Sequence, residues 1–187
     1  MNIVLIGFKG SGKTTAGKLL ADKLKFNFVD IDNLVLENFK SSHKTELTFD
    51  FTIQNIYKNL GEYKFRKLEE EVIFNIHSLK NTVIATGGGS VLSSINQKKI
   101  SDLGYVIYLQ ASPQDLFTRM EKNKIFPEFI DSEKPFSSFY AIYSERVKLY
   151  EGIANYTLDI SNKTQEEVAD ELVKFYKSLI KNNVSTG

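Results

Sequence analysis

The stretch that most constrains the fold of this chain is a glycine-rich run near the N-terminus, Gly7-Phe8-Lys9-Gly10-Ser11-Gly12-Lys13-Thr14. It fits the P-loop pattern, in which a glycine and any four residues are followed by Gly-Lys-Ser/Thr. An apolar run over 3–6 precedes it and a helical pattern over 16–24 follows it, so we expect a strand that turns sharply into a helix. Glycine permits such a turn, and the N–H groups at the helix start then attract phosphate.

This turn predicts a nucleotide-phosphate site. The residues expected to bind the phosphates are Gly10, Ser11, Gly12, Lys13, Thr14 and Thr15. Lys13 is expected to reach the β and γ phosphates, and the Thr14 hydroxyl to bind a magnesium ion. The alternative is a chance glycine-rich turn, against which the flanking strand and helix argue.

Composition narrows the class of protein. The chain has 187 residues, a formal net charge of +1, no cysteine and no apolar run near the ~20 residues that span a bilayer. We therefore expect one domain over 1–187 that is cytoplasmic and has no nucleic-acid or membrane partner. The 24 basic residues include only three arginines, Arg66, Arg119 and Arg146. Because arginine's planar fork suits phosphates and carboxylates, each is a site candidate, the alternative being a pair with a surface carboxylate.

The remaining hydrophobic pattern alternates strands with helices. Strands are predicted at 2–6, 26–30, 82–86, 105–109 and 156–160. Helices are predicted at 13–25, 33–39, 52–79 with a break near Gly61, 94–101, 113–121, 139–151 and 165–180. The polar segment 40–51 is expected to be a surface excursion, and 122–137 a loop. This alternation predicts an α/β protein of three layers, a P-loop fold whose five-stranded parallel sheet is flanked by helices.

Polar or glycine-rich residues directly follow three of the predicted strands. They are the P-loop, the pair Asp30 and Asp32, and Gly87-Gly88-Gly89. Because strand alternation points Asp30 and Asp32 the same way, one carboxylate is expected near magnesium and the other near a second substrate. The alternative is a pair that merely caps the next helix. The carboxyl ends of parallel strands share one edge, so these features are expected to converge.

A further pair lies on the predicted helix after Gly61. Arg66 and Glu69 are three residues apart, which makes them neighbours on one helix face. Taken alone, this spacing favours a surface ion pair of small energetic weight. The triple glycine replaces the acidic residue that ends the corresponding strand in many P-loop ATPases and GTPases, which favours a small-molecule kinase over a switch protein or motor.

Five pieces together resemble the shikimate kinase family, within the nucleoside-monophosphate-kinase-like group. In family order they are 7–14, 28–32, 61–69, 85–89 and 145–150, and the resemblance extends over about 2–180. It implies transfer of the γ-phosphate of ATP to the 3-hydroxyl of shikimate, a step of chorismate and aromatic amino acid biosynthesis. It also implies a helical substrate-binding subdomain at about 31–65, a mobile lid at about 122–137, and a monomer that binds shikimate and ATP.

The resemblance also assigns roles to individual residues. Asp30 supports Mg²⁺ beside Thr14, and Asp32 binds the shikimate hydroxyls and helps to orient or deprotonate the attacking one. The carboxylate grip is formed by Arg66 and Arg146, with Glu69 holding Arg66. The floor under the ring is Gly87, Gly88 and Gly89, while Arg119 stacks on adenine and Lys13 is catalytic together with Asp32.

Two departures from the family pattern leave alternatives open. The segment between Asp32 and Gly61 is longer than usual, and 40–51 is expected to hold the extra length. The lid ordinarily presents an arginine before a proline, where this chain has Phe126, so we hypothesise that Lys122 or Lys124 supplies the missing charge. The alternatives are a related kinase with a gluconate-like acceptor, or a catalytically weak kinase-fold binding protein.

Overall fold

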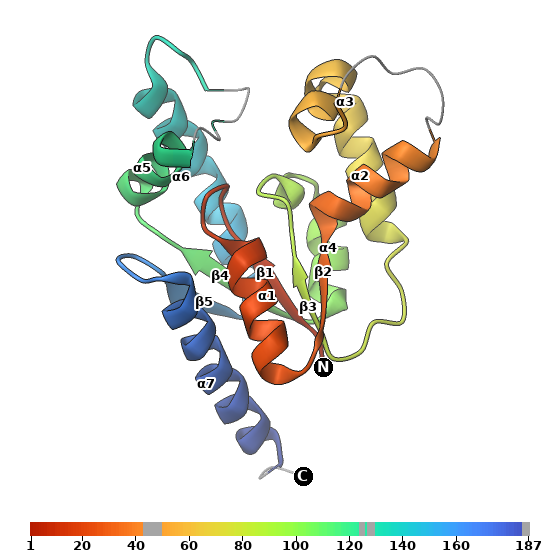
Figure 1. Ribbon diagram of the computed structural model, residues 1–187, viewed down its shortest axis with the longest axis vertical. Helices are drawn as coiled ribbons and strands as arrows, with labels where there is room; N and C mark the ends of the chain where they lie inside the picture. The colour runs from red at the N-terminus through yellow and green to blue at the C-terminus, as the bar shows by residue number, and fades with distance from the viewer. Residues whose placement is uncertain (43–49, 124–125, 127–129, 185–187) are drawn as a thin grey trace.

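The computed structural model describes residues 1–42, 50–123, 126 and 130–184 (Figure 1). The strands are β1 (Ile3–Ile6), β2 (Asn27–Asp30), β3 (Thr82–Ala85), β4 (Tyr105–Gln110) and β5 (Tyr156–Asp159). The helices are α1 (Lys13–Leu24), α2 (Ile31–Ser42), α3 (Ile53–Phe74), the short 3₁₀ helix η1 (Ser90–Leu92), α4 (Ser94–Leu103), α5 (Pro113–Asn123), α6 (Pro135–Ile153) and α7 (Gln165–Val184). None of the helices within these described ranges is long and apolar enough to cross a membrane.

The five strands form one parallel sheet in the order β2-β3-β1-β4-β5, which confirms the predicted α/β class. In a right-handed crossover, the helix lies on one face of the sheet when the chain moves toward the β2 edge. It lies on the opposite face when the chain moves toward the β5 edge. Accordingly α1 and α7 pack against each other, while α4 and α6 contact β4 (Figure 1). Residues of β1 and β3 are buried without alternation, as expected of strands covered on both faces.

The structure differs from the sequence prediction where α2 begins. The prediction placed this helix at 33–39, but it starts at Ile31, directly after β2, and continues to Ser42. Asp32 therefore lies in the first turn of a helix and not on a strand, so strand alternation does not relate it to Asp30. Residues 43–49 of the predicted excursion, with His43, lie outside the described residues.

Helices α5 and α7 begin where the sequence predicted, at 113 and 165. Ser112 caps α5 by accepting a hydrogen bond from the Asp115 N–H at 3.0 Å, and Thr164 accepts one from the Glu167 N–H at 3.3 Å. Gly61 breaks the helical pattern as predicted, with φ 75° and ψ 162° inside α3. Helix α6 starts earlier than predicted, because Pro135 already occupies its first turn, where a missing N–H costs nothing.

The sheet order brings the predicted site features together. β3 lies between β1 and β2, and Ala85 is the register partner of both Leu5 and Asp30. The Thr86 N–H continues the ladder by donating to the Leu5 carbonyl at 3.1 Å. The P-loop after β1, the carboxylates after β2 and the glycines after β3 therefore leave the sheet at the same edge, as predicted.

Helix α4 offers a matched test of the packing. Ile100 is 0% exposed, whereas Ile95 of the same helix is 57% exposed. We predict that Ile100→Ala lowers the free energy of unfolding by about 2–5 kcal/mol, because it leaves a cavity. Ile95→Ala should change it by no more than about 0.5 kcal/mol. Urea unfolding followed by circular dichroism measures both, and equal losses would contradict this burial.

Candidate functional site

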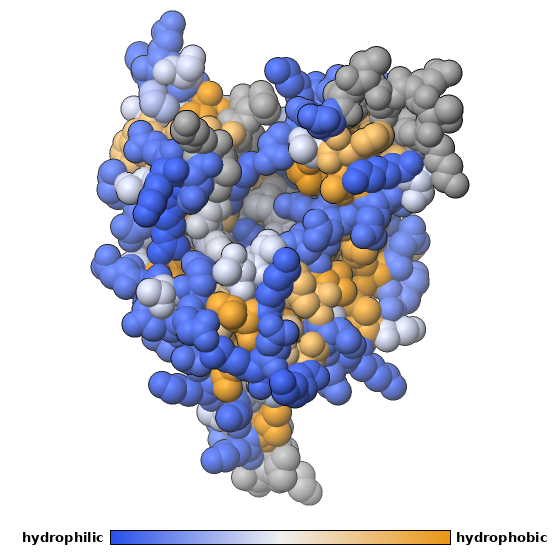
Figure 2. All heavy atoms as spheres, in the orientation of Figure 1, coloured by the Kyte–Doolittle hydropathy of each residue, from blue (hydrophilic) through white to orange (hydrophobic). Residues whose placement is uncertain are grey.

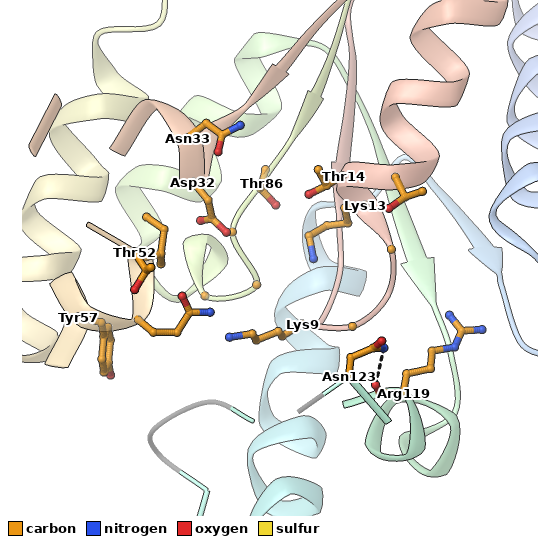
Figure 3. A pocket seen from close by; sticks show the side chains of 18 of the residues that line it. Lys9, Lys13, Thr14, Asp32, Asn33, Thr52, Tyr57, Thr86, Arg119 and Asn123 are labelled. Carbon is orange, nitrogen blue, oxygen red and sulfur yellow. Dashed lines mark hydrogen bonds between the residues drawn. The ribbon is translucent and has the colours of Figure 1, made fainter. Parts of the chain in front are cut away.

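A cleft of ≈ 950 Å³ opens at the carboxyl edge of the sheet. Figure 2 shows this face of the molecule, where mostly hydrophilic residues surround the hollow. The cleft is lined by the P-loop, the start of α2, residues of α3 from Ile53 to Glu69 that include Arg66, the glycine triplet, the end of α5, Arg146 of α6 and 163–165. Segments that are distant in the sequence thus share one cavity (Figure 3).

The P-loop has the backbone geometry that phosphate binding requires. Gly10 and Gly12 have φ of 87° and 80°, in the left-handed region that favours glycine. Gly12 is the N-cap of α1, so the amides that follow it and the positive end of the helix macrodipole face the cleft. This arrangement can hold the oxygens of a polyphosphate.

The Lys13 ammonium lies across this loop. Its Nζ donates to the carbonyls of Gly7 and Phe8, each at 2.9 Å, and the side chain is only 7% exposed. Burial lowers the pKa of Lys13 to about 8, while the nearby carboxylates of Asp32 and Asp30 oppose the shift. An anion bound in the loop would therefore gain a close, partly desolvated positive charge.

Asp30 joins the P-loop helix to the start of α2. Its Oδ2 accepts a 2.7 Å hydrogen bond from the Thr14 hydroxyl, and its Oδ1 accepts one from the Asp32 N–H at 3.0 Å. Asp30 thus caps the following helix, which the sequence analysis gave as the alternative to a functional role. The same carboxylate also accepts the hydrogen bond from Thr14. A hydroxyl and a carboxylate beside a phosphate cradle form a set of hard oxygen donors.

Asp32 lies in the wall of the cleft, facing the P-loop (Figure 3). Burial raises the pKa of its carboxyl to about 6, the Asp30 carboxylate adds to the shift and Lys13 opposes it. A carboxyl with such a pKa can accept a proton from a hydroxyl more readily than a fully solvated one.

Arg66 and Glu69 form an ion pair whose carboxylate is buried and whose guanidinium is 17% exposed, whereas the spacing alone favoured a surface pair. The Arg66 Nη1 donates to Glu69 Oε2 at 2.9 Å, and Glu69 is 1% exposed. The other oxygen, Glu69 Oε1, accepts from the Ser90 hydroxyl at 2.8 Å. The Arg66 guanidinium also lies over the rings of Tyr57 and Phe65, at 5.8 and 5.4 Å. These contacts hold the planar fork in one orientation at the cleft.

Arg146 reaches the same cleft from α6. Its guanidinium lies 5.3 Å from the centre of the Phe8 ring and the residue is 7% exposed. Burial lowers the pKa of Arg146, yet arginine remains charged at neutral pH. One turn along α6, the Tyr150 hydroxyl donates to the Gly88 carbonyl and so connects this helix to the glycine triplet. Two arginines from different helices are thereby directed to one place.

The glycine triplet is first required by the protein's own packing. A Cβ on Gly87 would lie 2.6 Å from the Asp32 carboxylate, and one on Gly88 would lie 2.9 Å from the backbone nitrogen of Lys9. A Cβ on Gly89 would overlap the guanidinium of Arg66. Side chains and backbone of the chain itself therefore occupy the space that a Cβ at any of these three positions would need.

The other end of the cleft holds the third arginine. Arg119 of α5 donates from Nη2 to the Ile160 carbonyl at 3.2 Å, which fixes it beside the loop after β5. Lys163, Thr164 and Gln165 line the same end, and Gln165 lies so close to Gly12 that a Cβ there would overlap its amide.

The structure places only part of the predicted lid. Lys122 lines the cleft beside Arg119, whereas Lys124 and Pro127 lie outside the described residues. The Phe126 ring packs against Phe117 of α5, with ring centroids 5.3 Å apart. Phe126 thus joins an aromatic cluster with Phe117, Phe136 and Phe139.

Three residues of the site were missed by sequence reasoning. Lys9 occupies a variable position of the P-loop pattern, so the motif gave no reason to single it out. Ser90 follows the glycine triplet directly, and a hydroxyl at that place was the available signal. Gln165 is the first residue of α7, and no local pattern distinguishes it from a helix-surface residue.

Comparison with known proteins gives one consistent result. Residues 9–177 match the family described as Shikimate kinase. The shikimate kinase of Caldanaerobacter subterraneus subsp. tengcongensis is 40% identical over 178 residues, covering 95% of this chain and 97% of that protein. The one of Alkaliphilus oremlandii is 37% identical over 173 residues, covering 92% and 96%.

Solved structures agree with this result. The shikimate kinase from Acinetobacter baumannii in complex with shikimate has a TM-score of 0.82 at 29% identity, covering 95% of this chain and 93% of that one. The shikimate kinase from Aquifex aeolicus has a TM-score of 0.75 at 28% identity, covering 98% and 99%. A gluconokinase from Sinorhizobium meliloti has a TM-score of 0.59 at 18% identity, which is a likeness of fold alone.

The buried position of Glu69 can be tested against an exposed neighbour. We predict that Glu69→Ala lowers the free energy of unfolding by about 1–3 kcal/mol, because it leaves the buried Ser90 hydroxyl without its acceptor and Arg66 without its closest carboxylate. Glu71→Ala, at an exposed position of the same helix, should change it by no more than about 0.5 kcal/mol. Guanidinium unfolding curves measure the difference, and two similar small values would show that the Arg66–Glu69 pair acts as a surface pair.

Proposed function

The chain belongs to the shikimate kinase family, and from this premise we propose how its own residues carry out the family's reaction. It is an ATP-dependent phosphotransferase that moves the γ-phosphate of ATP to the 3-hydroxyl of shikimate, giving shikimate 3-phosphate and ADP. This reaction is a step of aromatic amino acid biosynthesis. The observation that supports it best is that Lys13, Arg66 and Arg146 line one cleft.

The donor half of the site is the P-loop with Arg119. We assign the phosphates of ATP to the backbone of Gly10, Ser11 and Gly12 and to Thr15, with the Lys13 ammonium at the β and γ phosphates. Adenine is assigned to Arg119, whose guanidinium is held by the Ile160 carbonyl and whose planar face suits stacking.

Magnesium is assigned to Thr14 and Asp30. The fit rests on the 2.7 Å hydrogen bond between the Thr14 hydroxyl and the Asp30 carboxylate, which places two hard oxygen atoms beside the phosphate cradle. The described residues contain no cluster of three or more His, Cys, Asp or Glu that could hold a metal. Mg²⁺ commonly takes one or two protein oxygens and completes its shell with phosphates and water. When bound, the ion neutralises phosphate charge.

The acceptor half is formed by the two helices that converge on the glycine triplet. We assign the shikimate carboxylate to Arg66 and Arg146, because both forks reach the cleft and Glu69 fixes one of them. Gly87, Gly88 and Gly89 form the floor under the ring. Asp32 binds the ring hydroxyls, orients the attacking one and accepts its proton as the new bond forms.

Catalysis then depends mainly on alignment. Holding the acceptor by its carboxylate leaves one hydroxyl toward the γ-phosphate, and this positioning replaces a bimolecular encounter by an intramolecular one. Lys13 neutralises charge on the phosphoryl group in flight. We propose that 31–65 acts as the substrate-binding subdomain of this single domain and that 122–137 closes over ATP, which keeps water from competing as acceptor.

We further propose that the protein is a monomer that works in the cytoplasm without a nucleic-acid or membrane partner. The formal net charge of +1 supports the last part of this proposal, since it provides no general attraction to anionic polymers or lipids. A gluconate-like acceptor is not favoured, because the related structure of that class shares the fold alone.

The experiment is a coupled assay of ADP release with shikimate, with gluconate and without acceptor. We expect rapid release with shikimate and only background release in the other two reactions. Lys13→Ala should lower kcat about 100-fold or more, because it removes charge stabilisation that grows in the transition state. Lys18→Ala, at an exposed position of α1, should leave kcat unchanged.

Faster turnover of gluconate than of shikimate would overturn the substrate assignment. A wild-type protein that binds ATP but releases ADP with neither acceptor would instead show a binding protein. Circular dichroism spectra of both lysine variants separate a loss of chemistry from a loss of fold.

A further inference from the structure

The proposed function already assigns all three arginines that line the cleft, Arg66 and Arg146 to the shikimate carboxylate and Arg119 to adenine. Arg66 is paired with Glu69, Arg119 is held by the Ile160 carbonyl, and Arg146 is buried on the Phe8 ring. Phe126, at the lid position before Pro127, packs into the aromatic cluster beside Phe117. Any second cation for the transferring phosphoryl group must therefore come from another residue type.

Lys9 lies where the donor and acceptor halves of the cleft meet. Its backbone packs directly on Gly88, where a Cβ would lie 2.9 Å from the Lys9 nitrogen and 3.6 Å from its Cα. Gly88 is itself held by the Tyr150 hydroxyl, so the base of the Lys9 side chain has a fixed position on the floor of the acceptor half. The residue also belongs to the loop that cradles phosphate.

The Lys9 side chain extends into the cleft. Figure 3 shows it pointing from the P-loop toward the side on which Asp32, Thr52 and Tyr57 lie, whereas Arg119 points the opposite way. Lys9 is among the charges that act on both Lys13 and Asp32, so its ammonium is within electrostatic range of the donor cation and of the acceptor carboxylate. Lys122, near the C-terminal end of α5, also lines the cleft.

Two lysines of one loop directed into one cavity repel each other. Such an arrangement is stabilised when an anion lies between them, and the more so as that anion gains charge on its outer oxygens. The transferring phosphoryl group is the anion that passes between the P-loop and the acceptor.

We propose that Lys9 is a second catalytic cation, which contacts the equatorial oxygens of the phosphoryl group during transfer; this rests on the kinase function proposed above. In that step the 3-hydroxyl oxygen forms a bond to the γ-phosphorus while the bond to the β–γ bridging oxygen breaks. ADP leaves with that electron pair, and the hydroxyl proton passes to Asp32. Lys9 stays protonated throughout. Its flexible side chain supplies the positive charge that Phe126, at the lid position, cannot supply.

The test compares Lys9→Met, which keeps length without charge, with Lys9→Arg, which keeps the charge. We expect Lys9→Met to lower kcat about 100-fold, as loss of one transition-state donor does elsewhere. KM for ATP and for shikimate should change by less than about threefold, since the contact strengthens only in the transition state. Lys9→Arg should restore kcat to within about tenfold of wild type, because a cation of similar reach is retained. Lys98→Met, an exposed site on α4, should have no effect.

A binding measurement gives a readout independent of turnover. Calorimetry should show that Lys9→Met weakens binding of ADP with aluminium fluoride, a mimic of the phosphoryl group in flight, in proportion to kcat. Its affinity for ADP alone should stay unchanged, which also shows that the variant is folded.

Three results would overturn the proposal. They are a kcat of Lys9→Met within twofold of wild type, a rise in KM for shikimate at unchanged kcat, and a loss of kcat and analogue affinity in Lys122→Met but not in Lys9→Met. A wild type inactive toward shikimate would instead refute the proposed function. The analogue affinities of the two lysine variants would still decide the place of Lys9.

Discussion

The site depends on close packing over a stretch of backbone that carries no side chains. Three segments approach Gly87-Gly88-Gly89: α2 through the Asp32 carboxylate, the P-loop through the Lys9 backbone, and α3 through the Arg66 guanidinium. Any Cβ in the triplet would displace one of them. Because a strand end is a rigid support, these contacts fix the distance between the phosphate cradle and the groups assigned to the acceptor.

The polar contacts around the triplet make the acceptor half rigid in orientation as well as in place. Glu69 is buried and uses both oxygens, so it would lose its closest ion pair if Arg66 turned away and a hydrogen bond if Ser90 did. Tyr150 performs a similar task on the opposite side by donating to the Gly88 carbonyl. Such pre-organisation favours catalysis by alignment, because little ordering remains to be done when the acceptor arrives.

Much of this arrangement could be predicted from the sequence because its signals are local. Three patterns each indicate their local structure within a few residues. They are the glycines of the P-loop, the unbroken apolar strands and the glycine triplet. The parallel sheet then dictates that the carboxyl ends of β1, β2 and β3 meet at one edge. The convergence of the P-loop, Asp30 and Gly87 follows from topology alone.

The rest depends on packing, which sequence spacing does not encode. The Arg66–Glu69 spacing is the same for a surface pair and a buried one, and burial is decided by Ser90 and the triplet. Strand alternation failed for Asp32 because α2 begins at Ile31 with no intervening loop. Lys9 stood at a variable position of its motif, and its importance appears only when Gly88 is seen beneath it.

The proposed mechanism requires that the glycine triplet hold the ATP site and the shikimate site in a fixed relative position within one cleft. A crystal structure of the protein with ADP and shikimate tests it most directly. We expect the shikimate carboxylate between the guanidinium groups of Arg66 and Arg146, the ring over Gly87–Gly89, and the 3-hydroxyl directed toward Lys13. A shikimate molecule whose carboxylate contacts neither arginine, or whose 3-hydroxyl faces away from the P-loop, would contradict it.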